Sequence, residues 1–456
     1  MILTTPDNIF SDGFTDDLDL FGRKPLFEQI MRVALQAPDE NLVLALEDKW
    51  GNGKSTFVKM MTSEIKSNHD NLNVIYFDAY ENDYQSDPFI SLSSVIYEMV
   101  ENDKKLTSMF GEKLLSASKK IGLSVLSHTA KFAISTATAN LLTTTAIEKA
   151  SDAIAESLTN PLEEYIADKI KSAKNERNNI VHFKETLEEI HARTQKKTLI
   201  IIDELDRARP DYALDLLEKI KHLFSVKGFV FLLVVNREQF EKSIECRYGQ
   251  IDSRLYLNKF IHYWFTLPKF TLASEDVRNG FYQSTLEKYL LSIDTKQKLL
   301  TRGGSLVKIL SMLLENNGCS LREAERCYSV LSVIDNKHMI RDLSGKNFQV
   351  SLALICYLKV CNPKLLEDLI FKRITADNML KNLHIKPHEI GTDANLSKLN
   401  SIINYHLLSD SEMRNRRENS QPKDLLLQEI EGNRNERIEY IQNIYDSLNN
   451  MRISNF

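Results

Sequence analysis

Residues 48–56 read DKWGNGKST and follow a short apolar run, Asn41–Glu47. They fit the second half of the phosphate-binding pattern G-x-x-x-x-G-K-[ST]. Glycines let such a loop curl until its backbone N–H groups point at phosphate oxygens, and the next helix turns its positive end toward the same anion. The lysine then neutralises β- and γ-phosphates, and the hydroxyl after it binds Mg²⁺. The predicted phosphate-site residues are Gly51, Asn52, Gly53, Lys54, Ser55 and Thr56, with Lys54 also expected to be catalytic.

Asp48 departs from the pattern, which has glycine at its first position. Aspartate tolerates a left-handed backbone better than most residues, so the loop can still form. A carboxylate beside the phosphates would nevertheless weaken nucleotide binding, because like charges repel.

A second acidic motif follows the apolar run Thr198–Ile202, where the sequence continues with Asp203 and Glu204. Carboxylates at the carboxyl end of a buried strand are typical of a Walker B motif. We expect Asp203 to hold Mg²⁺ together with Ser55, and Glu204 to polarise the attacking water. The predicted cofactors are therefore ATP and Mg²⁺, and the alternative is an acidic turn.

Two polar residues further along are candidates for reading the nucleotide state. Asn236 follows the apolar run 229–235, a position from which a polar side chain could sense the γ-phosphate; the simpler interpretation is a turn-forming asparagine. Arg254 lies where AAA+-like sheets face a neighbouring subunit, so it is a candidate arginine finger. Arg247 is its rival, and a plain surface arginine is the alternative.

Residues 320–323 have the S-x-x-E form of a capping box, which predicts a helix starting near Leu321. Arg322 would then lie in the first turn and could reach the nucleotide from a helical lid. An ordinary exposed arginine is the competing interpretation.

The elements that must position these residues are predicted from hydrophobic patterning. The runs 41–47, 74–77, 198–202 and 229–235 are apolar at nearly every position, which favours strands covered on both faces, as in a parallel sheet. Residues 262–267 could form a fifth strand. After Pro210, apolar residues recur every three or four positions, which indicates a helix. The predicted fold class is α/β, a P-loop NTPase parallel sheet flanked by helices.

From about residue 269 the patterns become helical and no further strand is predicted; the last fifty residues, which include Arg414–Arg417, favour a solvated helix or tail. We predict a P-loop domain in two halves, a helical insertion between them, a helical lid and a helical C-terminal domain. Their expected bounds are 1–117 and 176–268 for the halves, 118–175 for the insertion, 269–340 for the lid and 341–456 for the C-terminal domain.

The predicted insertion contains an unusual stretch, Ile121–Ile147, in which 14 of 27 residues are Ser, Thr or Ala and only Lys131 is charged. Small residues let helices approach closely. A soluble helical hairpin or an oligomer contact is the preferred interpretation, and a membrane-peripheral element or disorder are the alternatives.

Composition sets wider limits. The 456 residues are 43% hydrophobic and 27% charged, which is typical of a globular protein of about three domains. A net charge of −5 offers no general attraction to nucleic acid, so such a role would need a local basic patch. The five cysteines include no C-x-x-C pair, which argues against zinc and disulfide scaffolds and favours the reducing cytoplasm. The N-terminus does not resemble a signal peptide, and no window has 18 uncharged apolar residues.

Taken together, the chain resembles the KAP-type P-loop NTPases, a branch of the additional-strand class near the STAND and AAA+ groups. The resemblance rests on residues 50–55 (WGNGKS), 77–81 (FDAYE), 202–207 (IDELDR), 256–259 (YLNK) and 321–326 (LREAER). Residues 20–23 (LFGR) resemble the upstream segment that packs near adenine, which implies that Phe21 and Arg23 contact the nucleotide. Tyr80 stands where the family usually has Trp.

The resemblance implies an ATPase that forms homo-oligomers, switches conformation with nucleotide state and regulates a protein partner, as in phage exclusion and defence by bacterial relatives. Many relatives carry two membrane helices at the place that Ile121–Ile147 occupies here. The alternatives are a nucleotide-binding scaffold with little turnover, a membrane-peripheral organiser acting through 121–147, and DNA translocation by an assembled ring.

Overall fold

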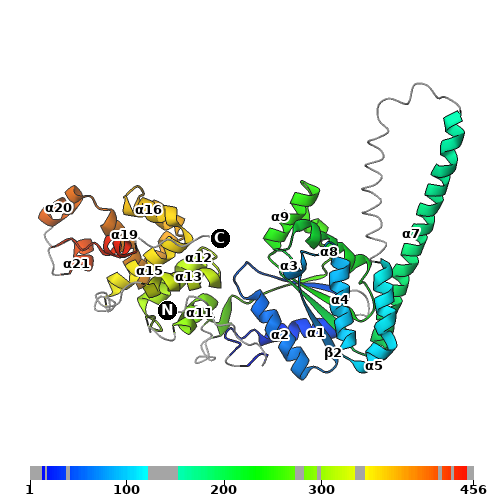
Figure 1. The fold of residues 1–456 in the computed structure, drawn as a ribbon. Coiled ribbons are helices and arrows are strands. Elements are labelled where there is room, and N and C mark those ends of the chain that lie inside the picture. Colours follow the sequence, from blue (N-terminus) through cyan, green and yellow to red (C-terminus); the bar gives the residue numbers. More distant parts are fainter. Residues whose placement is uncertain are drawn as a thin grey trace.

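The fold is seen in a computed structural model, which describes residues 13–15, 18–36, 42–121, 153–272, 282–294, 299–333, 345–419, 424–432 and 436–448. Within these residues a five-stranded sheet has the order β2-β3-β4-β1-β5, and every neighbouring pair is parallel. The five predicted strands and the α/β fold class are confirmed (Figure 1). The strands are β1 (Leu42–Glu47), β2 (Leu72–Asp78), β3 (Lys197–Asp203), β4 (Phe229–Val235) and β5 (Tyr263–Thr266).

Both faces of the sheet are buried, which explains why the central strands are apolar throughout. Alternate residues of β4 point to opposite faces, so Phe231 and Leu232 lie in different hydrophobic clusters. Helices α1 (Lys24–Gln36) and α2 (Lys54–Asn68) cover one face. The other face is covered by α4 (Pro88–Glu101), α8 (Pro210–His222), α9 (Arg237–Tyr248) and the end of a long helix, α7 (Ala153–Thr194).

The connection from β2 to β3 is much longer than one crossover helix requires. It contains α3 (Ala79–Asn82), α4, α5 (Lys104–Leu106), the π-helical segment η1 (Thr107–Gly111) and α7, whose 42 residues reach far beyond the sheet in Figure 1. Phe183 and Leu187 anchor the end of α7 in the core. Residues 122–147 of the Ser/Thr/Ala-rich stretch lie outside the described residues. Among the helices that the structure describes, none combines the length and apolar character needed to cross a membrane.

After β5 the chain is mainly helical and builds a second hydrophobic core around α15. The prediction that no strand follows residue 269 is wrong, because β6 (Phe270–Leu272) and β7 (Tyr282–Ser284) form an antiparallel ribbon. Three residues are too few for a period of two to show in the sequence. The remaining helices are α10 (Ser253–Leu257), α11 (Thr285–Ile293), α12 (Ser305–Asn316), α13 (Leu321–Val333), α15 (Lys346–Cys361), α16 (Pro363–Ile370), α17 (Ala376–Asn382), α18 (Pro387–Ile390), α19 (Ala394–Leu407), α20 (Asp410–Asn419), α21 (Leu425–Glu431) and α22 (Tyr440–Ser447).

Candidate nucleotide-binding site

The loop between β1 and α2 has the backbone that its glycines predict. Gly51 and Gly53 have φ values of 83° and 81°, a left-handed conformation that glycine adopts without steric cost. Gly53 is also the N-cap of α2, so Lys54 and Ser55 form its first turn. Free backbone N–H groups and the positive end of the helix dipole therefore lie at the place where the sequence predicts phosphates.

Lys54 is only 8% exposed, and its ammonium folds back over the loop. Its Nζ donates to the backbone carbonyl oxygens of Asp48 at 2.7 Å and Lys49 at 3.2 Å. Burial lowers the pKa of Lys54, an effect opposed by the neighbouring carboxylates of Asp206, Asp48 and Asp203. A bound phosphate would offer this ammonium a stronger, charged acceptor than two carbonyls.

Ser55 and Asp203 are brought together although 148 positions separate them. The Ser55 hydroxyl lies near the Asp203 carboxylate, which accepts hydrogen bonds from the Tyr76 hydroxyl at 2.9 Å and the Glu204 N–H at 2.9 Å. Burial raises the pKa of Asp203, and these hydrogen bonds oppose that rise. A hydroxyl and a carboxylate are the oxygen donors that Mg²⁺ prefers, so the residues fit this ion. Ser55 and Asp203 would hold it, and it would supply charge neutralisation to the phosphates.

Glu204 lies at the tip of β3 with a φ of 54°, which turns the chain sharply after the strand. Its carboxylate forms a 2.8 Å ion pair with Arg207. Burial raises the pKa of Glu204, and Arg207 opposes the rise. The predicted base is thus at the cavity wall, held by a neighbouring cation.

Asp48 has a structural role that the sequence did not reveal. Its side chain is 5% exposed, and both carboxylate oxygens pair with Lys269 Nζ, at 2.6 and 2.5 Å. Asp48 Oδ1 also accepts from Asn52 Nδ2 at 2.6 Å. The carboxylate therefore braces the loop and is neutralised, which answers the concern that it would repel phosphate.

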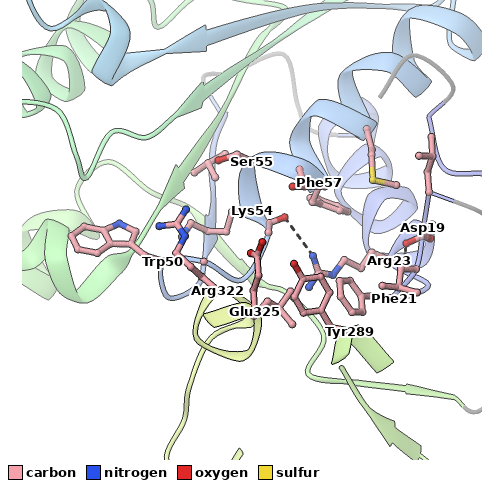
Figure 2. Close-up of a pocket in the computed structure, with 18 of the residues that line it drawn as sticks. Asp19, Phe21, Arg23, Trp50, Lys54, Ser55, Phe57, Tyr289, Arg322 and Glu325 are labelled. Atoms are coloured by element: carbon pink, nitrogen blue, oxygen red, sulfur yellow. Dashed lines mark hydrogen bonds between the residues drawn. The ribbon is translucent and has the colours of Figure 1, made fainter. Parts of the chain in front are cut away.

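A cavity of about 650 Å³ lies over this loop, a size usual for small-molecule sites. The sheet domain supplies the phosphate loop, Asp203 and Glu204, and the helical region supplies Tyr289, Arg322 and Glu325 (Figure 2). Predicted site residues that line this cavity are Phe21, Arg23, Gly51, Gly53, Lys54, Ser55, Thr56, Asp203, Glu204 and Arg322.

Phe21 and Arg23 line the cavity beside Tyr289, on the side away from Trp50 (Figure 2). The Arg23 guanidinium lies 4.5 Å from the centre of the Phe21 ring and donates to the carbonyl oxygen of Asn52 at 3.1 Å. Burial lowers the pKa of Arg23 to about 10. The rings of Phe21 and Tyr289 are 6.3 Å apart, so an aromatic pair from two distant segments flanks this end of the cavity.

The start of α13 packs directly on the phosphate loop, and the capping box predicted there is present. Ser320 N–H donates to Glu323 at 2.6 Å, and Glu323 N–H donates to Ser320 Oγ at 3.4 Å. The Leu321 N–H donates to Asn52 Oδ1 at 3.3 Å. A Cβ on Gly51 would lie 2.7 Å from Arg322 Cβ, so glycine is required for this approach.

Three predicted residues do not line the cavity that the described residues form. One is Asn52, whose side chain bonds to Asp48 and the Leu321 N–H. Asn236 is buried near Asp206, but its Oδ1 caps α9 by accepting from the Gln239 N–H. Arg254 lies on α10 with a side chain 76% exposed, 3.8 Å from Glu241. Sensing by Asn236 and an arginine finger at Arg254 stay predictions.

Several site residues carry no role in the sequence prediction. Tyr76 binds Asp203, and the Trp50 indole N–H donates to Asp206, a buried carboxylate that also lines the cavity. Trp50, Asp206 and Arg207 belong to the motifs that carry the family resemblance, and those motifs are the sequence signal that could have marked them as site residues. Tyr76 sits inside an apolar strand, and no local pattern marks it.

The first strand of the parallel sheet leads into a glycine-rich loop that ends in Lys54 and Ser55. This loop lies beside the acidic residues that end β3. Together these features define a P-loop NTPase fold. The sequence matches the KAP family P-loop domain over residues 23–339, more than two thirds of the chain, and the chain belongs to this family. The predicted resemblance is therefore confirmed.

Solved structures similar to this chain include two of the ORC2 protein from Aeropyrum pernix. The ADP form has 12% identity and a TM-score of 0.33, covering 78% of this chain and 73% of that one. The ADPNP-ADP complexes have 12% identity and a TM-score of 0.34, covering 94% and 86%. No curated protein matches the sequence.

Proposed function

We propose that this protein binds ATP with Mg²⁺, hydrolyses it, and uses the cycle as an oligomeric conformational switch. The observation that carries the proposal is that Ser55, Asp203 and Glu204 line the same cavity, with Ser55 near enough to the Asp203 carboxylate to oppose the rise in its pKa. The cavity joins the phosphate loop to the acidic strand end, and Glu204 follows Asp203 at the next position. Phosphate cradle, metal ligands and candidate base thus converge on one cavity, as phosphoryl transfer requires.

Phosphate release tests the proposal. The wild-type chain should hydrolyse ATP only with Mg²⁺, and Lys54→Ala should abolish both nucleotide binding and turnover. Glu204→Gln should bind ATP normally while losing roughly 10²- to 10⁴-fold in rate, because it removes only the base. Lys66→Ala, an exposed lysine in the last turn of the same helix, is the control. Wild-type rates in Glu204→Gln would refute the base assignment.

A nucleotide-binding scaffold with little turnover is the second candidate, and the Glu204–Arg207 ion pair favours it. A carboxylate engaged by a guanidinium is a poorer base than a free one. This candidate predicts tight, Mg²⁺-dependent ATP binding. It also predicts that phosphate is released no faster by the wild type than by Glu204→Gln.

The switch is proposed to work through self-assembly and a protein partner. Arg254 is exposed, as a residue reaching into a neighbouring subunit must be. Mass photometry should show larger assemblies with ATP than without, and Arg254→Ala should lower hydrolysis at high protein concentration more than Arg247→Ala does. A particle mass that stays monomeric with ATP would refute self-assembly.

The family resemblance extends the proposal to anti-phage defence. Phage should form fewer plaques on cells that express the chain together with its genomic neighbours. The Glu204→Gln variant should restore the plaque number. Equal plating with and without the wild-type chain would refute this role.

A further inference from the structure

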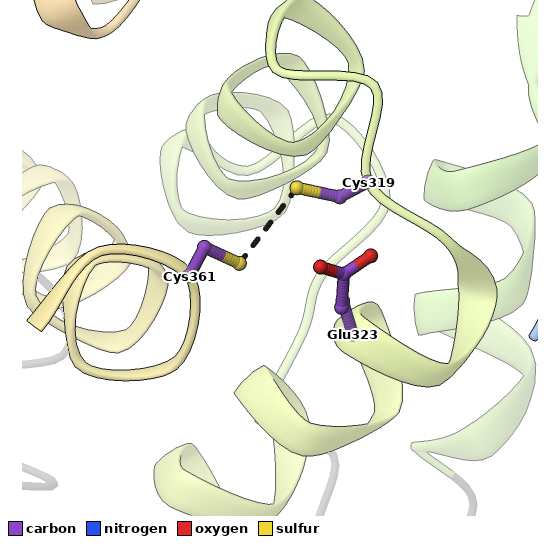
Figure 3. A group of neighbouring side chains, drawn as sticks. All are labelled: Cys319, Glu323 and Cys361. Carbon is purple, nitrogen blue, oxygen red and sulfur yellow. Dashed lines mark hydrogen bonds between the residues drawn. The ribbon is translucent and has the colours of Figure 1, made fainter. Parts of the chain in front are cut away.

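Beneath the helical wall of the cavity, the fold brings together cysteines that are far apart in sequence. Cys319 lies just before α13, and Cys361 is the last residue of α15. Their sulfur atoms are 3.7 Å apart although 42 positions separate them (Figure 3). Cys327, on the next turns of α13, is fully buried and interacts with the Cys361 thiol.

Glu323 completes the cluster. Its carboxylate, Cys319 Sγ and Cys361 Sγ each lie within 4.8 Å of the other two ligand atoms. The hydrogen bonds of the capping box from Ser320 end on a single oxygen, Glu323 Oε2. The second oxygen, Oε1, takes no part in the capping box. The carboxylate can therefore cap the start of α13 and bind a cation at the same time.

The spacing of the two sulfurs matches a known coordination geometry. Thiolates bound tetrahedrally to zinc at about 2.3 Å stand about 3.8 Å apart, close to the observed 3.7 Å. Two sulfurs with one carboxylate favour a soft or borderline dication over Mg²⁺ or Ca²⁺.

We propose that Cys319, Cys361 and Glu323 form a binding site for Zn²⁺ or a similar thiophilic dication, with Cys327 the nearest further sulfur. Binding releases two protons to solvent, because both cysteine ligands must be thiolates. Because protons compete with the metal for the two sulfurs, binding should strengthen as pH rises. The sequence-based expectation against zinc rested on local spacing, and this site is assembled from α13, the segment before it and the end of α15.

The position of the site links it to the nucleotide cavity. Cys319 directly precedes Ser320, whose Oγ would contact a Cβ on Gly51, and Lys49 Nζ donates to the Gly318 carbonyl oxygen at 3.1 Å. A metal that ties Cys319 to Cys361 would fix this segment to α15. We therefore expect the metal to tighten nucleotide binding as well as to raise thermal stability.

Cobalt titration tests the site without any enzyme assay. The full chain, reduced and freed of metal under nitrogen, should bind one equivalent of Co²⁺ with a sulfur-to-cobalt charge-transfer band and intense visible bands, and Zn²⁺ should bleach both. Cys319→Ser and Cys361→Ser should each remove most of the charge-transfer band. Glu323→Gln keeps an acceptor for the helix cap. It should weaken Co²⁺ binding, but the charge-transfer band should still appear once the site is saturated with Co²⁺.

Two cysteines serve as matched controls. Cys246→Ser removes an exposed thiol of α9, and Cys356→Ser removes a buried thiol of α15 outside the cluster. Both should keep the cobalt spectrum. The proposal is overturned if no charge-transfer band forms, if the band survives in Cys319→Ser, or if it disappears in Cys246→Ser.

A measurement on the wild-type chain covers the case in which a variant fails to fold. Alkylation followed by peptide mass spectrometry should show that Zn²⁺ protects Cys319 and Cys361 but leaves Cys246 reactive. Equal labelling of all three with and without Zn²⁺ would also overturn the proposal.

Discussion

Arg207 forms a 2.8 Å ion pair with the carboxylate of Glu204, which lies three positions earlier in the sequence, directly after β3. The arginine opposes the rise in the pKa of Glu204 that burial causes. A proposed base and its neutralising partner thus lie in a single tight turn.

Removing that partner should change the pH profile of hydrolysis. In Arg207→Ala the pKa of Glu204 should rise, and since a base must be deprotonated, the acidic limb of the kcat/KM profile should move to higher pH. Arg209→Ala, which removes an exposed arginine two residues on, should leave the limb in place. An unmoved limb in Arg207→Ala would show that Glu204 does not govern the profile.

Lys269 should matter for nucleotide affinity, because it neutralises the Asp48 carboxylate inside the phosphate loop. In Lys269→Ala we expect ATP to bind roughly fivefold more weakly, a loss of about 1 kcal/mol, as titration calorimetry would measure. Adding Asp48→Asn removes the charge that the first substitution leaves unpaired and keeps an acceptor for Asn52, so the double variant should recover most of the affinity. No recovery would mean that Lys269 acts on nucleotide in another way.

Gly51→Ala should break the contact between the phosphate loop and α13. The new Cβ would lie 2.7 Å from Arg322 Cβ at a φ of 83°, so both strain and a clash are expected, at a cost of about 1–3 kcal/mol. Gly303→Ala is the control, with a φ of 77° and nothing within 4 Å. The unfolding temperature and the ATP affinity should both fall further in Gly51→Ala than in Gly303→Ala. Equal losses in the two variants would show that the clash is relieved.

The Mg²⁺ requirement should depend on Tyr76 and on pH. Tyr76→Phe removes a hydrogen bond to Asp203, so half-maximal hydrolysis should need roughly tenfold more Mg²⁺. Burial raises the pKa of Asp203, and protons compete with the metal, so the Mg²⁺ needed by the wild type should increase as pH falls. Tyr97→Phe, on α4 and outside the cavity lining, should leave the Mg²⁺ requirement unchanged. A Mg²⁺ requirement of Tyr76→Phe equal to that of the wild type would contradict the proposed role of Asp203.

The sheet and the phosphate loop could be predicted because their signals are local. A strand covered on both faces must be apolar throughout, so β1, β3 and β4 stand out, and the glycine loop repeats a known spacing. The ribbon β6–β7 could not be predicted, since its strands are too short for a period to show.

The wall of the cavity depended on packing between distant segments. Phe21 meets Tyr289, and Arg322 meets Gly51, through contacts that no local pattern encodes. Asn236 was singled out for its place at a strand end, which the structure confirms, yet the side chain caps α9. Position on a strand is a property of the sequence, but the direction of a side chain follows from its neighbours.

The sequence by itself therefore determined the fold class, the phosphate loop and the acidic strand end, because each depends on residues adjacent along the chain. Only the tertiary structure decided that Asp48 is neutralised by Lys269 and that Cys319 faces Cys361. Both pairs join positions 42 or more residues apart, and their distance is set by how helices and strands pack. Charge balance and ligand geometry are properties of that packing.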